Sequence, residues 1–74
     1  MNPWNVPLNL FIAFLIANGC KKIRHHKGHM VFSHANATRP IVIQDHIDPV
    51  PLHVVKSNLR TLGLTLKDIR NFNP

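Results

Sequence analysis

The sequence has few acidic residues and little cysteine. Its 74 residues contain three acidic residues, all Asp, no Tyr and one cysteine, Cys20. A single thiol excludes an internal disulfide framework and a four-thiolate zinc site, and it is typical of a reduced, cytosolic protein. Nine Lys and Arg leave a formal charge of +6. This charge predicts an anionic partner, which is nucleic acid, an anionic membrane surface or an acidic protein.

The chain also lacks a long hydrophobic run. The longest run, residues 10–17, is too short to span a bilayer, which needs about 20 residues. It has the length of a signal-peptide core, but no Lys or Arg precedes it, so we expect neither a membrane segment nor export. A length of 74 residues with 45% hydrophobic residues predicts one small globular domain over residues 1–74.

An amphipathic pattern predicts a first helix that begins near Pro7 and ends at Asn18-Gly19. Its apolar stripe consists of Leu8, Phe11, Ile12 and Leu15. Three further apolar residues lie outside the stripe, namely Leu10, Phe14 and Ile16. Either the sheet covers them or they face a partner chain, and the second alternative predicts a homo-oligomer formed through this helix.

Three strands are predicted to follow, at the roughly ten-residue intervals of an antiparallel meander. They cover a basic, half-buried segment at 21–25, an alternating segment at 30–34 and an apolar segment at 39–44. Gly28 is the predicted turn residue between the first two strands. Met30 and Phe32 are predicted to face the core, which leaves His29 facing solvent.

The C-terminal third predicts two more helices. Asp48, Pro49 and Pro51 end the strand region. The helix that follows has a predicted core face of Leu52, Val55, Leu59 and Leu62, and Gly63 ends it. Thr65 and Asp68 predict a capping box for a short last helix. The expected fold is therefore α+β, with an α-β-β-β-α order and a three-stranded antiparallel sheet whose helices pack on one face.

Three other residues have predicted packing roles. Trp4 and Phe14 are expected to pack, and stacking on a nucleic-acid base is the alternative for Trp4. Cys20 is expected to be a small buried hydrophobe.

Six histidines in so short a chain are unusual. His25 and His26 are adjacent on a predicted strand, so they should face opposite sides of the sheet. The other four have no zinc-ligand spacing, and no carboxylate or second cysteine is expected beside them; they are His29, His34, His46 and His53. We therefore predict no metal site and no cofactor. The chain also lacks a glycine-rich phosphate loop and paired carboxylates.

Metal-independent RNA cleavage fits the residue types that remain. A base must take the proton of a 2′-hydroxyl, and histidine, with an ordinary pKa of about 6.5, suits that step. Cationic side chains stabilise the additional charge on the phosphate. Such residues are concentrated in positions 21–29, as Lys21, Lys22, Arg24, His25, His26, Lys27 and His29. The alternative, which composition alone favours, is a solvated basic strand that only binds phosphate.

A series of short motifs has a recognisable order. It runs through Asn18-Gly19-Cys20, Lys22-Ile23-Arg24 and Lys27-Gly28-His29-Met30-Val31-Phe32, and continues in residues 41–46, 55–64 and 65–69. This ordered set, over about residues 8–72, resembles the HicA messenger-RNA interferases, the toxins of HicA–HicB toxin–antitoxin systems, also called the YcfA-like family. The chain departs from the family in having Lys27-Gly28-His29 in place of Gly-Ser-His, and in a first helix without charged residues.

The resemblance implies a fold similar to a double-stranded RNA-binding domain. It also implies a metal-independent endoribonuclease that cleaves messenger RNA and arrests translation in a prokaryotic cytoplasm, with a HicB-like antitoxin covering its active face. By position, His29 matches the family's catalytic histidine. The residues that we expect to contact RNA beside it are Lys22, Arg24, His25, His26, Lys27, Gly28, Arg39 and His46. The alternatives are a non-catalytic RNA-binding module and an antitoxin-binding protein of the same fold.

Overall fold

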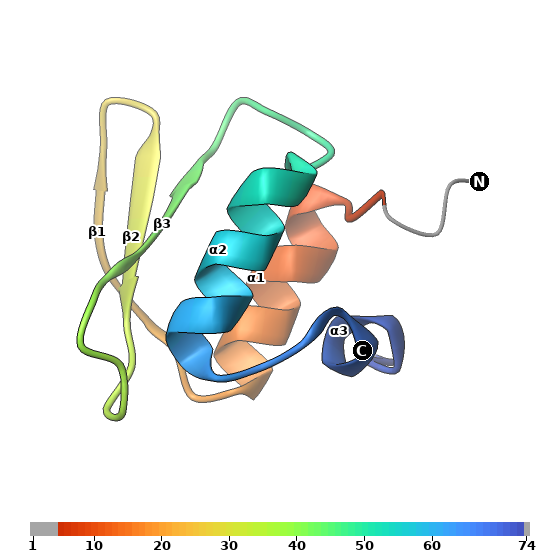
Figure 1. The fold of residues 1–74 in the computed structure, drawn as a ribbon. Coiled ribbons are helices and arrows are strands. Elements are labelled where there is room, and N and C mark those ends of the chain that lie inside the picture. The colour runs from red at the N-terminus through yellow and green to blue at the C-terminus, as the bar shows by residue number, and fades with distance from the viewer. Residues whose placement is uncertain (1–4, 74) are drawn as a thin grey trace.

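The computed structural model describes residues 5–73, so the prediction for Trp4 lies outside the described residues. The elements are α1 (Leu8–Ala17), β1 (Lys21–His26), β2 (His29–Ser33), β3 (Ile41–Gln44), α2 (Leu52–Leu62) and α3 (Leu66–Arg70). Figure 1 shows this order along the ribbon. It confirms the predicted α+β fold, with an α-β-β-β-α arrangement followed by a short helix.

The three strands form one antiparallel sheet in the order β1-β2-β3, so β2 is central. A two-residue turn, Lys27-Gly28, joins β1 to β2, and the residues that flank it, His26 and His29, are Cα partners. Lys27 has a φ of 49° and Gly28 a φ of 80°. Positive φ at both central positions is the geometry of a type I′ turn, which matches the twist of the strands that it connects. The predicted turn at Gly28 is therefore confirmed.

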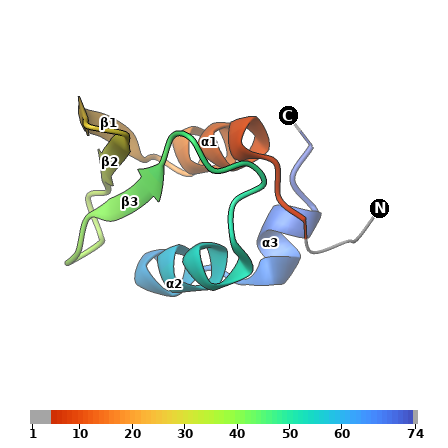
Figure 2. The ribbon, with the colours of Figure 1, turned by 90° about the horizontal axis from the view of Figure 1, so that it is seen from above.

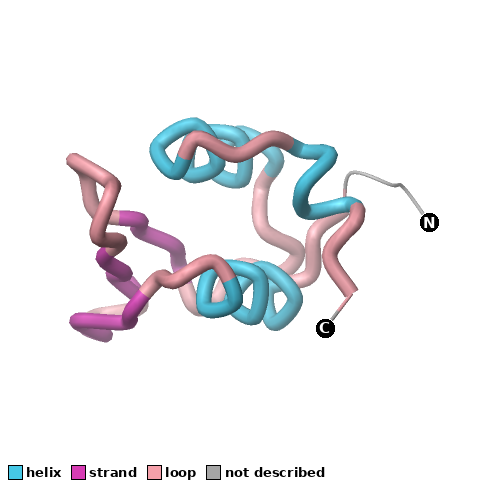
Figure 3. The backbone as a smooth tube through the Cα atoms, turned by 90° about the horizontal axis from the view of Figure 1, so that it is seen from below, coloured by secondary structure: helices cyan, strands magenta, loops and turns pink. Residues whose placement is uncertain are grey.

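Helices α1 and α2 pack on the same face of the sheet, and α3 lies farther from the sheet than either (Figure 2). The opposite face of the sheet, called the outer face below, carries no helix of residues 5–73 (Figures 1 and 3). The core lies between the sheet and the helices. Its buried side chains include Phe11, Phe14, Leu15, Met30, Phe32, Ile41, Ile43, Val55, Leu59 and Ile69. Met30 and Phe32 thus face the core as predicted, and Cys20 is one of the buried core residues.

The C-terminal segment covers Phe14, one of the three residues of α1 outside the predicted stripe. Phe14 is only 2% exposed. Its ring stacks on Phe11 with centroids 6.4 Å apart, and it meets the edge of Phe72 at 5.4 Å. Neither the sheet nor a partner chain is therefore needed to bury Phe14. Ile16 stays 58% exposed, and Leu10 packs partly buried against the core.

Three predictions about burial and strand limits are wrong. All six residues of β1 are exposed, because β1 is the edge strand that the helices do not cover; a bulge at Ile23 also interrupts its pairing with β2. Leu52 is 37% exposed at the first turn of α2, whereas Leu59 of the same helix is buried. Arg39 precedes β3 instead of starting it, since Pro40 has no N–H to donate to a neighbouring strand.

The loop between β3 and α2 is held against the start of α1. The N–H of Val50 donates to the carbonyl of Val6 at 2.8 Å, which forms an isolated antiparallel bridge. The N–H of Leu8 donates to Oδ1 of Asp48 at 3.0 Å. A carboxylate is favourable there because the first N–H groups of a helix have no partner within the helix. The Asp48–Pro49 peptide in this loop is cis.

The two C-terminal helices are bounded as the sequence predicts. α2 ends at Gly63, whose φ of 71° is the left-handed conformation typical of helix C-caps. Thr65 and Asp68 form the capping box of α3, with the Thr65 N–H donating to Oδ2 of Asp68 at 2.7 Å. No helix within residues 5–73 has the length and apolar character to cross a membrane.

The contact between Phe14 and Phe72 predicts how strongly the C-terminal segment stabilises the domain. Replacing the half-buried Phe72 with Ala should lower the free energy of unfolding by about 2 kcal/mol, less than for a fully buried Phe. Urea denaturation measures this change. Ile16→Ala, in the exposed position of α1, is the control and should change stability by less than about 0.5 kcal/mol. Equal effects of the two substitutions would contradict the proposed packing of Phe72.

Candidate functional site

One end of the sheet gathers most of the histidines. The β1–β2 turn and the start of the β3–α2 loop lie together at this end, whereas the β2–β3 loop lies at the other (Figure 1). The residues of the β1–β2 turn and its flanks, together with the first two residues of the β3–α2 loop, are called the turn cluster below: His25, His26, Lys27, Gly28, His29, Asp45 and His46. All of them except Asp45 are predicted site residues, so the fold brings most of the predicted site together.

Asp45 is the carboxylate of the turn cluster. Nε2 of His25 lies 2.6 Å from Oδ2 of Asp45, and Nδ1 of His46 lies 3.5 Å from Oδ1. The hydrogen bond from His25 is the main cause that lowers the pKa of Asp45. Desolvation opposes it, and a weaker hydrogen bond from His46 lowers the pKa further. Asp45 is therefore ionised at neutral pH, and its Oδ2 accepts a hydrogen bond from the Nε2–H group of His25.

The Asp45–His25 bond connects the two edges of the sheet. His25 is on β1 and Asp45 follows β3, so the contact passes over the end of β2 at Gly28. The N–H of Asp45 also donates to the carbonyl of Gly28 at 2.8 Å. These bonds hold the turn between β1 and β2 in a fixed position relative to the β3–α2 loop.

Gly28 makes this close approach feasible. A Cβ atom at position 28 would lie 3.3 Å from Nδ1 of His46 and 3.5 Å from Oδ1 of Asp45. The φ of 80° at Gly28 is also one that residues with a side chain rarely adopt. Backbone conformation and available space thus both favour glycine at this position, directly before His29.

His29 faces away from the helices, as predicted. Its Cα partners are His26 on β1 and Gln44 on β3, so these three exposed side chains form a row across the outer face. Directly opposed residues on neighbouring strands have Cβ atoms about 4.5–5.5 Å apart, close enough for two imidazoles to contact one phosphate group. Within residues 5–73, the side chain of His29 has no hydrogen-bond or ion-pair partner.

The other predicted RNA contacts are divided between two faces of β1. Arg24 shares the outer face, because its partner Val31 occupies the same face as His29. Lys22 pairs with Phe32, and His25 pairs with Met30. Both partners are core residues, so Lys22 and His25 lie on the helix side of the sheet, at its uncovered edge. The basic strand therefore does not present one continuous cationic surface.

Arg39 is not brought to the turn cluster. It lies in the β2–β3 loop, before Ile41, which pairs with Phe32 near the far end of β2.

His34 also lies near the far end of β2, and it has a structural role. The N–H of Asn36 donates to Nδ1 of His34 at 3.1 Å, so Nε2 carries the proton and donates to the carbonyl of Asn18 at 2.9 Å.

Asp45 is the site residue that sequence reasoning missed. The expectation that no carboxylate lies beside His29, His34, His46 and His53 is wrong for His46, which Asp45 contacts together with His25. The available signal was that one of only three acidic residues directly precedes His46. Its contact with His25, however, follows from the pairing of all three strands. Residues 5–73 bring together no group of three or more His, Cys, Asp or Glu suited to hold a metal ion.

The site offers proton transfer and phosphate binding on one surface. The imidazoles of His26 and His29 can accept and donate protons, and Lys27 and Arg24 add positive charge beside them. Comparison of the chain with protein-family models, curated proteins and solved structures gives no match. The geometry of the turn cluster and the order of the sequence motifs are therefore the features that point to a function.

The conformation of Lys27 predicts a stabilising substitution. A φ of 49° is unfavourable for lysine, by about 1–2 kcal/mol, whereas asparagine tolerates it and is preferred with glycine in type I′ turns. Lys27→Asn should therefore raise the free energy of unfolding by about 0.5–1 kcal/mol, a shift of a few degrees in thermal unfolding. Lys22→Asn, on the exposed strand, controls for the lost charge and should not stabilise. A less stable Lys27→Asn variant would contradict this account of the turn.

The contact between His25 and Asp45 predicts a measurable pKa. The carboxyl pKa of Asp45 should lie below 3.8 in the parent protein and rise toward that ordinary value in His25→Ala. An NMR titration of the carboxyl carbon measures both. Because the pKa is lowered in the folded state, the contribution of Asp45 to stability is complete above the ordinary Asp range and is lost as the pH falls through the lowered value. His53→Ala, which removes a histidine elsewhere, should leave the titration unchanged.

Proposed function

We propose that the protein is a metal-independent endoribonuclease that cleaves messenger RNA, and that it acts as the toxin of a toxin–antitoxin pair. The observation that carries this proposal is the pair His26 and His29, which lie opposite each other on the outer face and flank Lys27. The formal charge of +6 and the HicA-like order of motifs support it. An acidic, HicB-like antitoxin is the proposed partner, and it would cover the outer face.

The proposed reaction needs two proton transfers at one phosphate. His29 takes the proton of a ribose 2′-hydroxyl, and the resulting O2′ attacks the adjacent phosphorus. The bond between phosphorus and O5′ breaks, and protonated His26 donates its proton to the O5′ leaving group. Lys27 and Arg24 stabilise the charge that develops on the non-bridging oxygens. The products are a 2′,3′-cyclic phosphate and a new 5′-hydroxyl end.

His25 and Asp45 have a positioning role in this proposal. Their 2.6 Å hydrogen bond joins β1 to the residue after β3. The turn that separates His26 from His29 is therefore held from both sides. Catalysis benefits when proton-transferring groups are kept in place before the substrate binds.

A non-catalytic RNA-binding protein is the second candidate. It is favoured by the lack of a side-chain partner for His29 within the described residues, in contrast to the orientation that Asp45 imposes on His25. A catalytic base is commonly oriented by a third group. Product analysis separates the two candidates, since only a nuclease leaves new RNA ends.

His29→Ala tests the proposed activity. Loss of one acid–base group should slow RNA cleavage by at least about 100-fold. The assay incubates purified protein with a defined RNA and excess chelator, and it identifies the new ends as cyclic phosphate and 5′-hydroxyl.

Arg39→Ala is the control for this assay, because it removes one positive charge at the other end of the sheet and should leave most of the activity. Circular dichroism checks that each variant is folded. Cleavage by His29→Ala at the parent rate would overturn the proposed mechanism. If both the parent and His29→Ala bound the RNA but left it intact, the result would favour the non-catalytic RNA-binding protein.

A further inference from the structure

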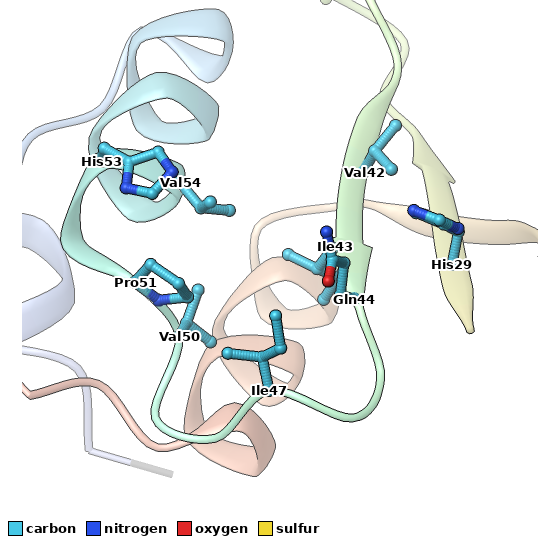
Figure 4. A pocket seen from close by; sticks show the side chains of 9 residues that line it. All are labelled: His29, Val42, Ile43, Gln44, Ile47, Val50, Pro51, His53 and Val54. Carbon is cyan, nitrogen blue, oxygen red and sulfur yellow. The ribbon is translucent and has the colours of Figure 1, made fainter.

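A groove opens between β3 and the first turn of α2, next to His29 (Figure 4). Its volume is about 390 Å³, in the lower part of the range of about 300–1,000 Å³ that is typical of small-molecule sites. Its apolar walls include Ile47, Val50 and Val54, and its polar groups are His29, Gln44 and His53. The groove therefore combines mainly apolar walls with a few polar groups, as expected of a site for a small organic group.

The backbone edge of β3 adds hydrogen-bonding groups to this groove. β3 is an edge strand, and the N–H of Asp45 donates to Gly28 on the β2 side. Backbone groups of alternate residues in an antiparallel edge strand point to opposite sides. Those of Val42 and Gln44 consequently point away from β2, and the side-chain amide of Asn58 donates to the carbonyl of Val42 at 3.3 Å.

The contact of Asn58 limits what can bind along this edge. A peptide that added a strand to β3 would need the carbonyl of Val42, which Asn58 already occupies. The backbone of Gln44 lies beyond this obstruction, at the end of β3 close to His29. The opening thus suits one compact planar group better than an extended peptide.

The charge of the surroundings indicates which compact group. The groove borders the row on the outer face through His29 and Gln44, and Lys27 lies in the adjoining turn. The whole chain carries a formal charge of +6. A ligand with a flat ring joined to a phosphate complements both features, and a nucleotide of single-stranded RNA has this chemistry.

We propose that this groove binds the nucleobase of the nucleotide next to the cleaved phosphate. Unstacked RNA bases are typically recognised by stacking on flat side chains and by hydrogen bonds to their edges. His53 and Pro51 offer the flat surfaces. The side-chain amide of Gln44 offers one donor group and one acceptor, and the backbone of Gln44 offers a second donor and a second acceptor. This inference rests on the proposed function, and it makes the groove the part of the site that selects where RNA is cut.

The test compares cleavage at all dinucleotide steps of a designed RNA. The parent should prefer one base or base class beside the cut. Gln44→Ala and the groove-filling Val54→Phe should reduce that preference by at least about tenfold, the factor that corresponds to a base contact of about 1.4 kcal/mol. Ser33→Ala, at the far end of the outer face, is the matched control and should keep the preference. Unchanged preference in folded Gln44→Ala would overturn the inference.

A binding measurement separates this inference from the proposed nuclease activity. NMR titration with the four nucleoside 3′-monophosphates, and with ribose 5-phosphate as a base-free probe, follows the amide signals of Gln44, His53 and Val54. Base-dependent shifts in the parent and in His29→Ala support the nucleobase site even if no RNA is cut. If ribose 5-phosphate caused equal shifts, the nucleobase site would be ruled out while the nuclease proposal would stand. The same conclusion would follow if the parent cleaved RNA but no nucleotide shifted these signals.

Discussion

The antiparallel register of the sheet is the constraint on which the rest of the structure depends. Met30 and Phe32 are buried against the helices, and this burial decides which residues of β2 face outward. Because side chains alternate along a strand, a slip of one residue would move His29 to the core face and Met30 to solvent. The same register makes His29 the partner of both His26 and Gln44. The outward row, and the groove beside it, are therefore consequences of core packing.

A chain with three acidic residues uses two of them in long-range contacts that position the site. Asp45 accepts a hydrogen bond from His25, and Asp48 accepts one from the first N–H of α1. Each contact joins elements that are far apart in the sequence. Together they place the β3–α2 loop, with Ile47 between the two carboxylates, beside the end of the sheet. This loop supplies Asp45 and His46 to the turn cluster and Ile47 and Val50 to the groove, so its placement decides how the two surfaces adjoin.

The two surfaces offer different kinds of chemistry. The outer face carries exposed histidines and cations, which suit proton transfer and phosphate binding. The groove between β3 and α2 is mainly apolar and has few polar groups. His29 belongs to both surfaces, since it lies in the row and also lines the groove. A ligand with a phosphate and a flat ring can contact both surfaces at once, and this connects the proposed cleavage to the proposed base selection.

The sequence by itself determined the elements whose signals are local. The turn at Gly28, the end of α2 at Gly63 and the capping box of α3 depend on residues at most three positions apart, and the outward direction of His29 follows from the alternation in β2. The tertiary structure alone decided the exposure of β1, the cover that Phe72 gives to Phe14, and the placement of Arg39 at the end of the sheet away from the turn cluster. It also decided the bond between His25 and Asp45, twenty residues apart. The physical reason is that periodicity and capping act within one element, whereas these contacts depend on strand order and on how the chain closes over its core.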